Sequence, residues 1–512
     1  MVEQFVRKDP VNLPARRLLA QIYEVTAPDQ ALVEWEALTK AEPGNSANTI
    51  GYATAVIKVG QVGRLPEILA ALEKLAPESA DYHRLAAGSA LATGDFVGLR
   101  KHVDRLAALE PQNPLTRFTR AALQMNSPDP REVEQARVSL EEFAHGDALR
   151  IRATLALITD APRRWPEEKT TARLYTRLAD ELKLRGTGSA PHYVKIQGNS
   201  LPSAGLPTLI DHMAAQPALT ANDAVMLAQW MLQIGQAREA LFWLDGLDEP
   251  LRTTGIVRQS MATCAATLES WPRLEQLVSG GAWGPVPAEA VKLAFASHAL
   301  RAAQNDSKAG SQWSSAIRLS EQSLPGLRVL QRLARLWRWP DKQAQVLWVL
   351  VRHFPADEPA WRALTQLALV EDNSAELWRI YQAWTQAAPA NLVVQAERIF
   401  VGLLTRPGET GLGSSTEELF RQHPGIPAHR VARALALWRA GRAAEALALL
   451  DAVDLNYERE PRFALTRGLI LATLGHKAES EAMFALGQKT KLLPEERVLL
   501  AQARQPGNPP PP

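Results

Sequence analysis

The sequence predicts an all-α protein built from stacked helical hairpins. Three observations lead to this fold class: prolines recur at a nearly constant distance, apolar residues keep a fixed phase relative to those prolines, and turn-forming residues lie between the helices. The chain has 512 residues, which is too many for one ordinary hydrophobic core. We therefore expect an extended array of helices or several domains.

The prolines follow the same spacing in both halves of the chain. Proline ends a helix because it lacks the N–H group and its ring clashes with the preceding turn. Each proline is therefore predicted to close one structural unit of 33 to 35 residues. These prolines are Pro10, Pro43, Pro77 and Pro111 in the first half, and Pro355, Pro389 and Pro424 in the second.

Apolar residues stand twelve, eight and five positions before these prolines. Steps of four and three place such residues on one face of a helix, which predicts a helix directly before each proline. Only Gln343 is not apolar. The sets are Ala31, Trp35 and Leu38; Leu65, Leu69 and Leu72; Leu99, Val103 and Leu106; Gln343, Leu347 and Leu350; and Leu377, Tyr381 and Trp384.

A second group of apolar or small residues predicts another helix earlier in each unit. Turn-forming residues such as Gly60 and Gly94 separate the two helices. Each unit therefore has a first helix, a short turn, a second helix and a proline-ended turn, after which Asn45 or Ser46 can cap the next helix. The first-helix residues are Ala15, Leu18, Leu19 and Ile22; Tyr52, Ala53 and Val56; Ala86, Ala87 and Ala90; and Trp361, Leu364 and Ala368.

This unit resembles the tetratricopeptide repeat, a helical hairpin of 34 residues. Ala31 and Trp35 match its Ala-x-x-x-aromatic step, Trp361 matches its early large residue, and Gly468 matches its Leu-Gly portion. The resemblance covers residues 10–113 and 324–494, where many consensus glycines and tyrosines are missing. It implies a right-handed α-α superhelix, a solenoid of about a dozen divergent hairpins whose first helices line a concave wall.

The regularity of the pattern divides the chain into four segments. We predict an N-terminal array at 1–150, an irregular helical segment at 151–287, a C-terminal array at 288–504 and a disordered proline-rich tail at 505–512. The irregular segment contains a Gly/Pro/Ser-rich insertion at 185–207 with one strand-like run, HYVKI. A loop of this length is either a structural insertion or a binding loop.

The chain begins in the phase of a second helix. Val2 and Phe5 lie eight and five residues before Pro10, which suggests the hypothesis that the natural gene product extends upstream. The predicted location is cytoplasmic if the chain is complete, and membrane-tethered or periplasmic if an N-terminal anchor is missing. Arginine outnumbers lysine, as in proteins from GC-rich bacteria.

Composition and motifs argue against several function classes. The single Cys264 excludes an intramolecular disulfide or a Cys-based zinc site and is expected to be buried. A net charge of +2 with both signs mixed argues against a nucleic-acid partner. No run approaches the ~18 apolar residues of a membrane span. We expect no direct span in this chain.

No catalytic, cofactor-binding or metal-binding residues are predicted, and the chain is interpreted as a non-enzyme. The run QGNSLPSAG resembles a nucleophile elbow, but Pro202 stands where the second glycine is needed. The Gly411-x-Gly413 run lacks the Lys-Ser/Thr of a phosphate loop. His423 and His429 bracket a turn and are expected to be solvent-exposed rather than metal ligands.

The candidate partner-binding residues lie on predicted first helices. Arg328, Arg332 and Arg335 are spaced by four and three and share one helix face, and the next unit adds Arg362 and Gln366. Arginine forms paired hydrogen bonds to carboxylates, so this stripe could bind an acidic segment of a partner. A solvated face, or ion pairs within the chain, is the alternative. A Lys-x-x-x-Asn clamp for C-terminal carboxylates is absent from the corresponding helix.

A second candidate is Trp438 with its neighbour Arg439. Trp438 follows a small-residue face and precedes a turn, so it could point into the groove and anchor a partner. We interpret the chain as a scaffold or adaptor that presents a concave helical groove to a protein or peptide. The alternatives are an envelope assembly factor whose anchor is missing, and a helper array for a separate or upstream enzyme.

Overall fold

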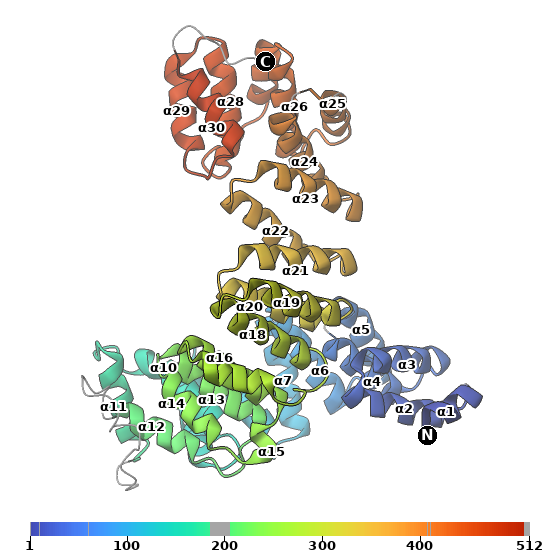
Figure 1. Ribbon diagram of the computed structural model, residues 1–512, viewed down its shortest axis with the longest axis vertical. Coiled ribbons are helices and arrows are strands. Elements are labelled where there is room, and N and C mark those ends of the chain that lie inside the picture. The colour runs from blue at the N-terminus through green and yellow to red at the C-terminus, as the bar shows by residue number, and fades with distance from the viewer. Residues whose placement is uncertain are drawn as a thin grey trace. The chain divides into compact units, whose positions relative to one another are not determined.

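The computed structural model describes residues 2–9, 11–59, 61–184, 205–406, 408–409 and 411–505. Within these ranges the chain forms 30 α-helices and one short 3-10 helix, and no strand (Figure 1). The predicted all-α class is therefore confirmed. The HYVKI run and residues 506–512 lie outside the described ranges, and the described part of the insertion, from Gly205, begins a helix.

The chain divides into two compact units, the first ending at Leu330 and the second beginning at Gln331. This boundary lies inside helix α20 (Leu324–Leu336). The first unit holds α1 (Val2–Lys8), α2 (Leu13–Thr26), α3 (Pro28–Ala41), α4 (Ser46–Lys58), η1 (Val62–Arg64), α5 (Leu65–Leu75), α6 (Ala80–Thr93), α7 (Phe96–Leu109), α8 (Pro114–Gln124), α9 (Pro130–His145), α10 (Arg150–Arg164), α11 (Thr171–Glu181), α12 (Gly205–Ala214), α13 (Ala221–Gln233), α14 (Ala237–Asp245), α15 (Glu249–Arg252), α16 (Gly255–Thr267), α17 (Trp271–Ser279), α18 (Ala288–Ala302) and α19 (Asp306–Ser320). The second unit holds α21 (Pro340–His353), α22 (Glu358–Val370), α23 (Ser374–Ala387), α24 (Leu392–Thr405), α25 (Leu412–Gln422), α26 (Pro427–Arg439), α27 (Ala443–Asp451), α28 (Pro461–Thr473), α29 (Lys477–Gly487) and α30 (Pro494–Ala503).

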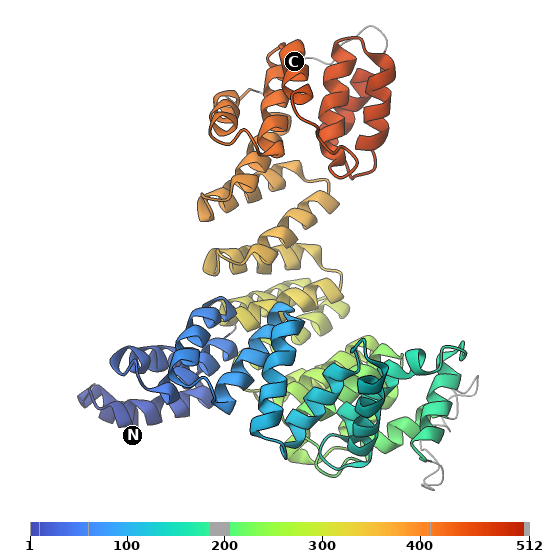
Figure 2. The same cartoon turned by 180° about the vertical axis from the view of Figure 1, so that it is seen from behind.

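Consecutive helices pack against each other as hairpins, and each hairpin packs on the next. The pairs α2 with α3 and α6 with α7 in the first unit, and α28 with α29 in the second, make extensive contacts. Both views show α28 and α29, drawn in red, lying side by side (Figure 1, Figure 2). Because α3 also contacts α4, the hairpins stack into an array within the unit. The predicted helical-hairpin architecture is confirmed.

The residues predicted in the second helices form the core of the hairpins. All of them are buried except Leu69 and Tyr381, which are half-buried, and even Gln343 is only 8% exposed. In the first helices, Ala15, Leu18, Leu19 and Ile22 lie in one helix, α2, as predicted, although Leu18 and Ile22 are exposed and only Leu19 among them is buried.

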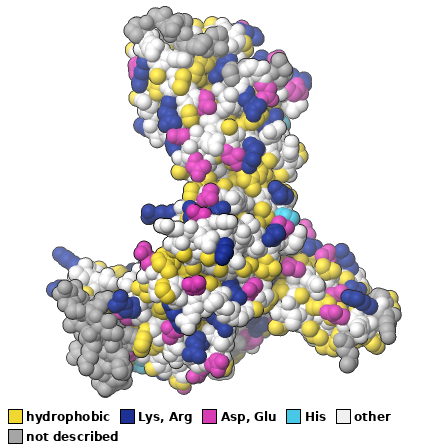
Figure 3. Space-filling model, viewed as in Figure 1, with side chains coloured by type: hydrophobic (Ala, Val, Ile, Leu, Met, Phe, Trp, Pro, Cys, Tyr) yellow, Lys and Arg dark blue, Asp and Glu magenta, His cyan; other side chains and the backbone are white. Residues whose placement is uncertain are grey.

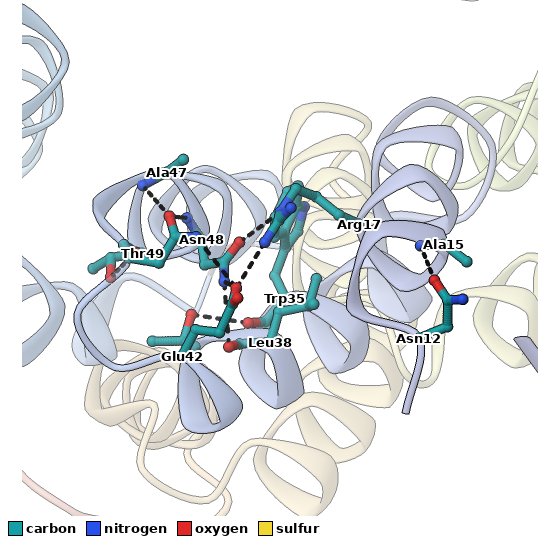
Figure 4. A network of polar contacts seen from close by, with 11 residues as sticks. Asn12, Ala15, Arg17, Trp35, Leu38, Glu42, Ala47, Asn48 and Thr49 are labelled. Atoms are coloured by element: carbon teal, nitrogen blue, oxygen red, sulfur yellow. Dashed lines mark hydrogen bonds and ion pairs between the residues drawn. The ribbon is translucent and has the colours of Figure 1, made fainter. Parts of the chain in front are cut away.

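The predicted turn after Pro43 is a helix cap joined to a buried polar network (Figure 4). The Asn45 side chain accepts hydrogen bonds from the N–H groups of Ala47 and Asn48, at 3.1 and 3.4 Å. The fully buried Asn48 side chain accepts from Arg17 Nε at 2.9 Å and donates to Glu42 Oε2 at 2.8 Å. Arg17 and Glu42 also form an ion pair at 2.7 Å. One polar network thus connects α2, the end of α3 and the start of α4.

The same arrangement recurs at the next-but-one proline turn. Asn113 caps α8 by accepting from the N–H groups of Leu115 and Thr116, at 3.0 and 3.3 Å. Glu110 accepts from Asn113 Nδ2 and pairs with Arg84, each at 2.8 Å. Arg84 lies on a first helix, as Arg17 does. The recurring Glu-Pro-x-Asn tetrad therefore ends one hairpin, caps the next and binds an arginine of the hairpin it closes.

The irregular middle segment also consists of hairpins where it is described. Helices α13 and α14 form a hairpin, with Gly235 at the turn in a left-handed conformation (φ 80°) that favours glycine. Cys264 is buried, as predicted, and burial raises the pKa of its thiol to about 12. Among the described helices, none combines the length and apolar character needed to cross a membrane.

One glycine in a helix interior allows two neighbouring hairpins to pack closely, because it has no side chain. A Cβ atom at Gly51 of α4 would lie 2.6 Å from the indole ring of Trp35 on α3. Trp35 is 4% exposed and its Nε1 donates to Glu24 Oε1 at 2.9 Å, so the ring is fixed by packing and by a hydrogen bond. The flat ring leaves no room for a methyl group at this position.

We expect Gly51→Ala to destabilise the first unit. Alanine favours a helix over glycine by roughly 1 kcal/mol, but overpacking against Trp35 costs about 1–3 kcal/mol, so the net effect is a loss. Gly88→Ala is the matched control, because Gly88 lies in α6 with nothing within 4 Å of an added Cβ and should gain stability. Urea unfolding followed by circular dichroism measures both. Equal stabilities of the two variants would contradict the packing.

Candidate protein-binding surface

The basic stripe predicted on first helices lies on α20 and α22. Arg328 is half-buried and engaged in an interaction within the chain, whereas Arg332 and Arg335 are exposed. Arg328 belongs to the first unit and the other two to the second. In the part of the chain that the structure describes, the side chains of Arg332 and Arg335 form no ion pair and no hydrogen bond.

The two predicted residues on α22 are exposed. Arg362 pairs with Glu358, one helical turn earlier, and its Nε lies 2.9 Å from Glu358 Oε1. An exposed pair of this kind contributes only about 0.3–0.5 kcal/mol, so Arg362 is readily available to another carboxylate. Gln366, one turn further along α22, is also exposed.

The prediction that Trp438 points into a groove was wrong. Its side chain is 2% exposed, and its Nε1 donates to Thr473 Oγ1 of α28 at 2.8 Å. This hydrogen bond and the burial of the indole make Trp438 part of the packing between α26 and α28. Arg439 is half-buried, and burial lowers the pKa of its guanidinium. The Trp438 side chain is therefore not presented to a partner, whereas a role for Arg439 in binding stays a prediction.

The two turn histidines also differ from expectation. His429 is 1% exposed and its Nε2 lies 3.0 Å from the carbonyl oxygen of Leu392, so it is an interior residue; His423 is half-buried. Their rings are 5.9 Å apart between centroids. Within the described ranges, no group of three or more His, Cys, Asp or Glu side chains is arranged to hold a metal ion.

Tryptophans of the second unit pack in the interior. Trp361, Trp378 and Trp384 are each less than 8% exposed. Trp361 and Trp384 stack with centroids 5.8 Å apart and rings within 4° of parallel. This aromatic stack fixes α22 against α23.

One feature of the second unit has no signal in the sequence: α30 and the segment before it contact the turn between α22 and α23. Two of these contacts, Ser374 with Glu495 and Val370 with Lys491, join residues 121 positions apart in the sequence. We name Asp372, Ser374, Lys491, Glu495 and Arg497 the clasp. The contacts are Lys491 Nζ to Asp372 Oδ1 at 3.2 Å, Arg497 Nη2 to Asp372 Oδ2 at 2.9 Å, Ser374 Oγ donating to Glu495 Oε2 at 2.6 Å, and Lys491 Nζ donating to the Val370 carbonyl at 2.8 Å.

Asp372 stands at the centre of the clasp. Its backbone is left-handed (φ 54°), which directs the turn between the two helices. Hydrogen bonding by Arg497 and then Lys491 keeps the pKa of its carboxyl below the usual range. The carboxylate is therefore ionised, and the clasp intact, at neutral pH.

A buried charge cluster lies deeper in the same unit. Arg462 of α28 lies between two carboxylates, with Nη1 3.3 Å from Glu397 Oε2 and Nε 3.6 Å from Glu496 Oε1. Glu496 is 1% exposed and its Oε2 accepts from the Leu493 N–H at 2.8 Å. Burial raises the pKa of both carboxyls against the opposing effect of Arg462. Two acids share one guanidinium, which links α24, α28 and α30.

A pocket of about 370 Å³ opens beside the clasp. Two of its lining cations, Lys491 and Arg497, are the clasp residues that hold Asp372. The third, Arg504, pairs with Glu481 at 2.8 Å. The lining residues are Gln488, Lys491, Leu492, Arg497, Leu500, Ala501 and Arg504, which combine three cations with an apolar wall and include no acidic side chain.

The fold and this surface define an all-helical repeat protein. No protein-family model matches the chain, and no curated protein matches it. Among solved structures, it is similar to Naa15/Naa10 bound to HypK-THB, with 13% identity over 93% of this chain and 75% of that chain and a TM-score of 0.25. It is also similar to yeast Tom70 (11% identity, 96% and 97%, TM-score 0.24) and to the APC/C hetero-tetramer Cut9-Hcn1 (13%, 96% and 96%, TM-score 0.26). Scores this low transfer nothing to this chain, and its fold class rests on its own helices.

We expect Glu496→Gln to change how stability depends on pH. Because the folded state raises the pKa of Glu496, protonation stabilises the fold below the unfolded pKa of about 4.3, and this contribution is lost as pH rises through the folded pKa. Glutamine keeps an acceptor for the Leu493 N–H but cannot titrate. The Tm of the variant should therefore fall less than that of the native chain as pH rises across this window.

Thermal unfolding from about pH 4 to about pH 8 spans the usual range of such carboxyls and measures the difference. Glu458→Gln is the control, because Glu458 is exposed in the same unit. Parallel pH profiles for Glu496→Gln and the native chain would contradict the assignment.

Proposed function

We propose that this chain is a tetratricopeptide-type scaffold that binds a protein or peptide partner on the exposed face of its first helices. The observation that carries the proposal is the pair of exposed arginines on α20, Arg332 and Arg335, which no carboxylate neutralises among the described residues. Two other exposed arginines of the second unit, Arg421 and Arg442, each pair with a glutamate three residues away on the same segment.

The position of these arginines supports binding rather than packing. α20 precedes α21 and α22 precedes α23, so both carry the first-helix position of their hairpins. In a stacked array of hairpins the core faces bury one another, and the remaining faces of the first helices form a continuous surface for an extended partner. Guanidinium groups on such a surface favour carboxylates, because each can donate two parallel hydrogen bonds.

The surrounding surface mixes charges of both signs. Lys and Arg side chains alternate with Asp and Glu over the visible face (Figure 3), in keeping with the net charge of +2. A mixed surface lacks the broad positive field that attracts nucleic acid without sequence preference. A partner is therefore selected by local groups such as Arg332, Arg335 and Gln366.

Site-specific photo-crosslinking in the native cells tests the proposal. A photoreactive amino acid at position 366 should give a discrete protein adduct, because Gln366 is exposed beside Arg362 on α22. The same amino acid at position 422, on α25, should not give this adduct.

The Arg332→Glu/Arg335→Glu double variant should bind the crosslinked protein at least about tenfold more weakly, a loss of about 1.4 kcal/mol. The matched control is Arg421→Glu/Arg442→Glu, which reverses the same amount of charge at exposed, paired arginines and should bind like the native chain. Equal binding by both double variants, measured by calorimetry with the purified partner, would eliminate the α20 face.

A further inference from the structure

The pocket beside α30 has the chemistry of a binding site for an amphipathic anion. Its three cations come from the start of α30, its end and the segment before it, and its apolar side is formed by Leu492, Leu500 and Ala501. Cations and apolar groups together suit a ligand that carries both negative charge and apolar side chains. A volume of about 370 Å³ holds a few side chains rather than a whole domain.

The chain already places a carboxylate on two of these cations. Asp372 contacts Lys491 and Arg497 from the α22–α23 turn, although it does not line the pocket itself. The position of Asp372 shows that Lys491 and Arg497 can bind a carboxylate. Because its side chain is 39% exposed and those of Lys491 and Arg497 are about half exposed, the pairs are weak in water and exchange readily.

We propose that this pocket binds an acidic peptide segment of a partner, and that Asp372 competes for the same cations until the segment displaces it. Binding then opens the clasp and frees the α22–α23 turn. The inference rests on the proposed function, since it assumes that the chain binds proteins, but it concerns residues other than the α20 and α22 face.

The apolar wall favours a peptide over a nucleic acid. Leu492, Leu500 and Ala501 can pack against apolar side chains between the acidic ones. A nucleic acid would place its phosphates along a row of exposed cations and its bases on aromatic rings, and no aromatic side chain lines this pocket. Glu495, the acidic residue nearest in sequence to the clasp cations, is bound by Ser374 and does not line the pocket.

The deeper contacts keep the unit folded while the clasp opens. Arg462, Glu397 and Glu496 join α28 and α30 to α24 independently of Asp372. The exposed pairs of the clasp can therefore exchange partners without separating these helices. Opening is confined to the α22–α23 turn and to the side chains of Lys491, Glu495 and Arg497 that contact it.

Fluorescence anisotropy with two labelled peptides tests the proposal on the full chain. The acidic probe is Glu-Glu-Leu-Asp-Asp-Leu, and the neutral probe, Gln-Gln-Leu-Asn-Asn-Leu, has the same apolar residues. Asp372→Asn keeps the cations and removes the competitor, so it should bind the acidic probe about five- to tenfold more tightly than the native chain. Lys491→Gln/Arg497→Gln should bind it at least about tenfold more weakly, and Arg421→Gln should match the native chain.

Hydrogen exchange gives a second readout that needs no variant. The acidic probe should slow exchange at residues 491–504 and speed exchange at residues 370–374, whereas the neutral probe should change neither. Equal affinity of Asp372→Asn and the native chain would overturn the competition, as would binding of oligouridylate as tightly as the acidic probe. If neither chain binds the acidic probe, the pocket is excluded, while crosslinking at position 366 still reports separately on the scaffold function.

Discussion

The spacing of neighbouring helices depends on the fit of glycine against an aromatic ring. Interiors pack at crystal-like density, so even one added methyl group must displace a neighbour. Gly51 and Gly402 lie on first helices and meet rings of the preceding hairpin, which fixes how hairpins stack. Gly468 meets a ring within its own hairpin and fixes the hairpin itself. The three pairs are Gly51 with Trp35, Gly402 with Trp378, and Gly468 with Phe484, with an added Cβ 2.5 to 2.6 Å from the ring in each.

The periodic part of this architecture can be predicted from the sequence, because the helical repeat that spaces the apolar residues along the chain also places them on one face of the helix. A residue eight positions before a closing proline lies on the buried face of the second helix, as Trp35 and Leu347 do. Burial also needs a neighbour that covers the face. Leu18 has the correct phase but remains 49% exposed, because phase identifies a face and does not say what packs on it.

Part of the candidate protein-binding surface could also be predicted from the spacing of apolar residues. Arg332 and Arg335 fall between the apolar positions of α20 and are exposed, as the spacing predicts, whereas Arg328 on the same stripe is half-buried because exposure also depends on the neighbouring contacts. Trp438 is large and lies beside a turn, and sequence alone cannot distinguish an anchor from a core residue there. The structure resolves this through Thr473, 35 residues further along the chain, which accepts the indole N–H. The clasp was not predictable, because charged residues at turns follow no period and contacts across 121 residues leave no local signal.

The clasp changes the energetics expected of a hairpin array. In an open array each hairpin contacts only its neighbours, so the terminal hairpin frays at little cost. Here the segment around α30 binds the α22–α23 turn through Asp372 and also binds α24 through Arg462. The two sets of contacts differ in exposure. The pairs of Asp372 are exposed to water and contribute little, whereas breaking the more buried contacts of Arg462 would leave a charge without a partner away from water. A charged partner can therefore compete with Asp372 for Lys491 and Arg497. The contacts of Arg462 with Glu397 and Glu496 meanwhile keep the C-terminal helices in place.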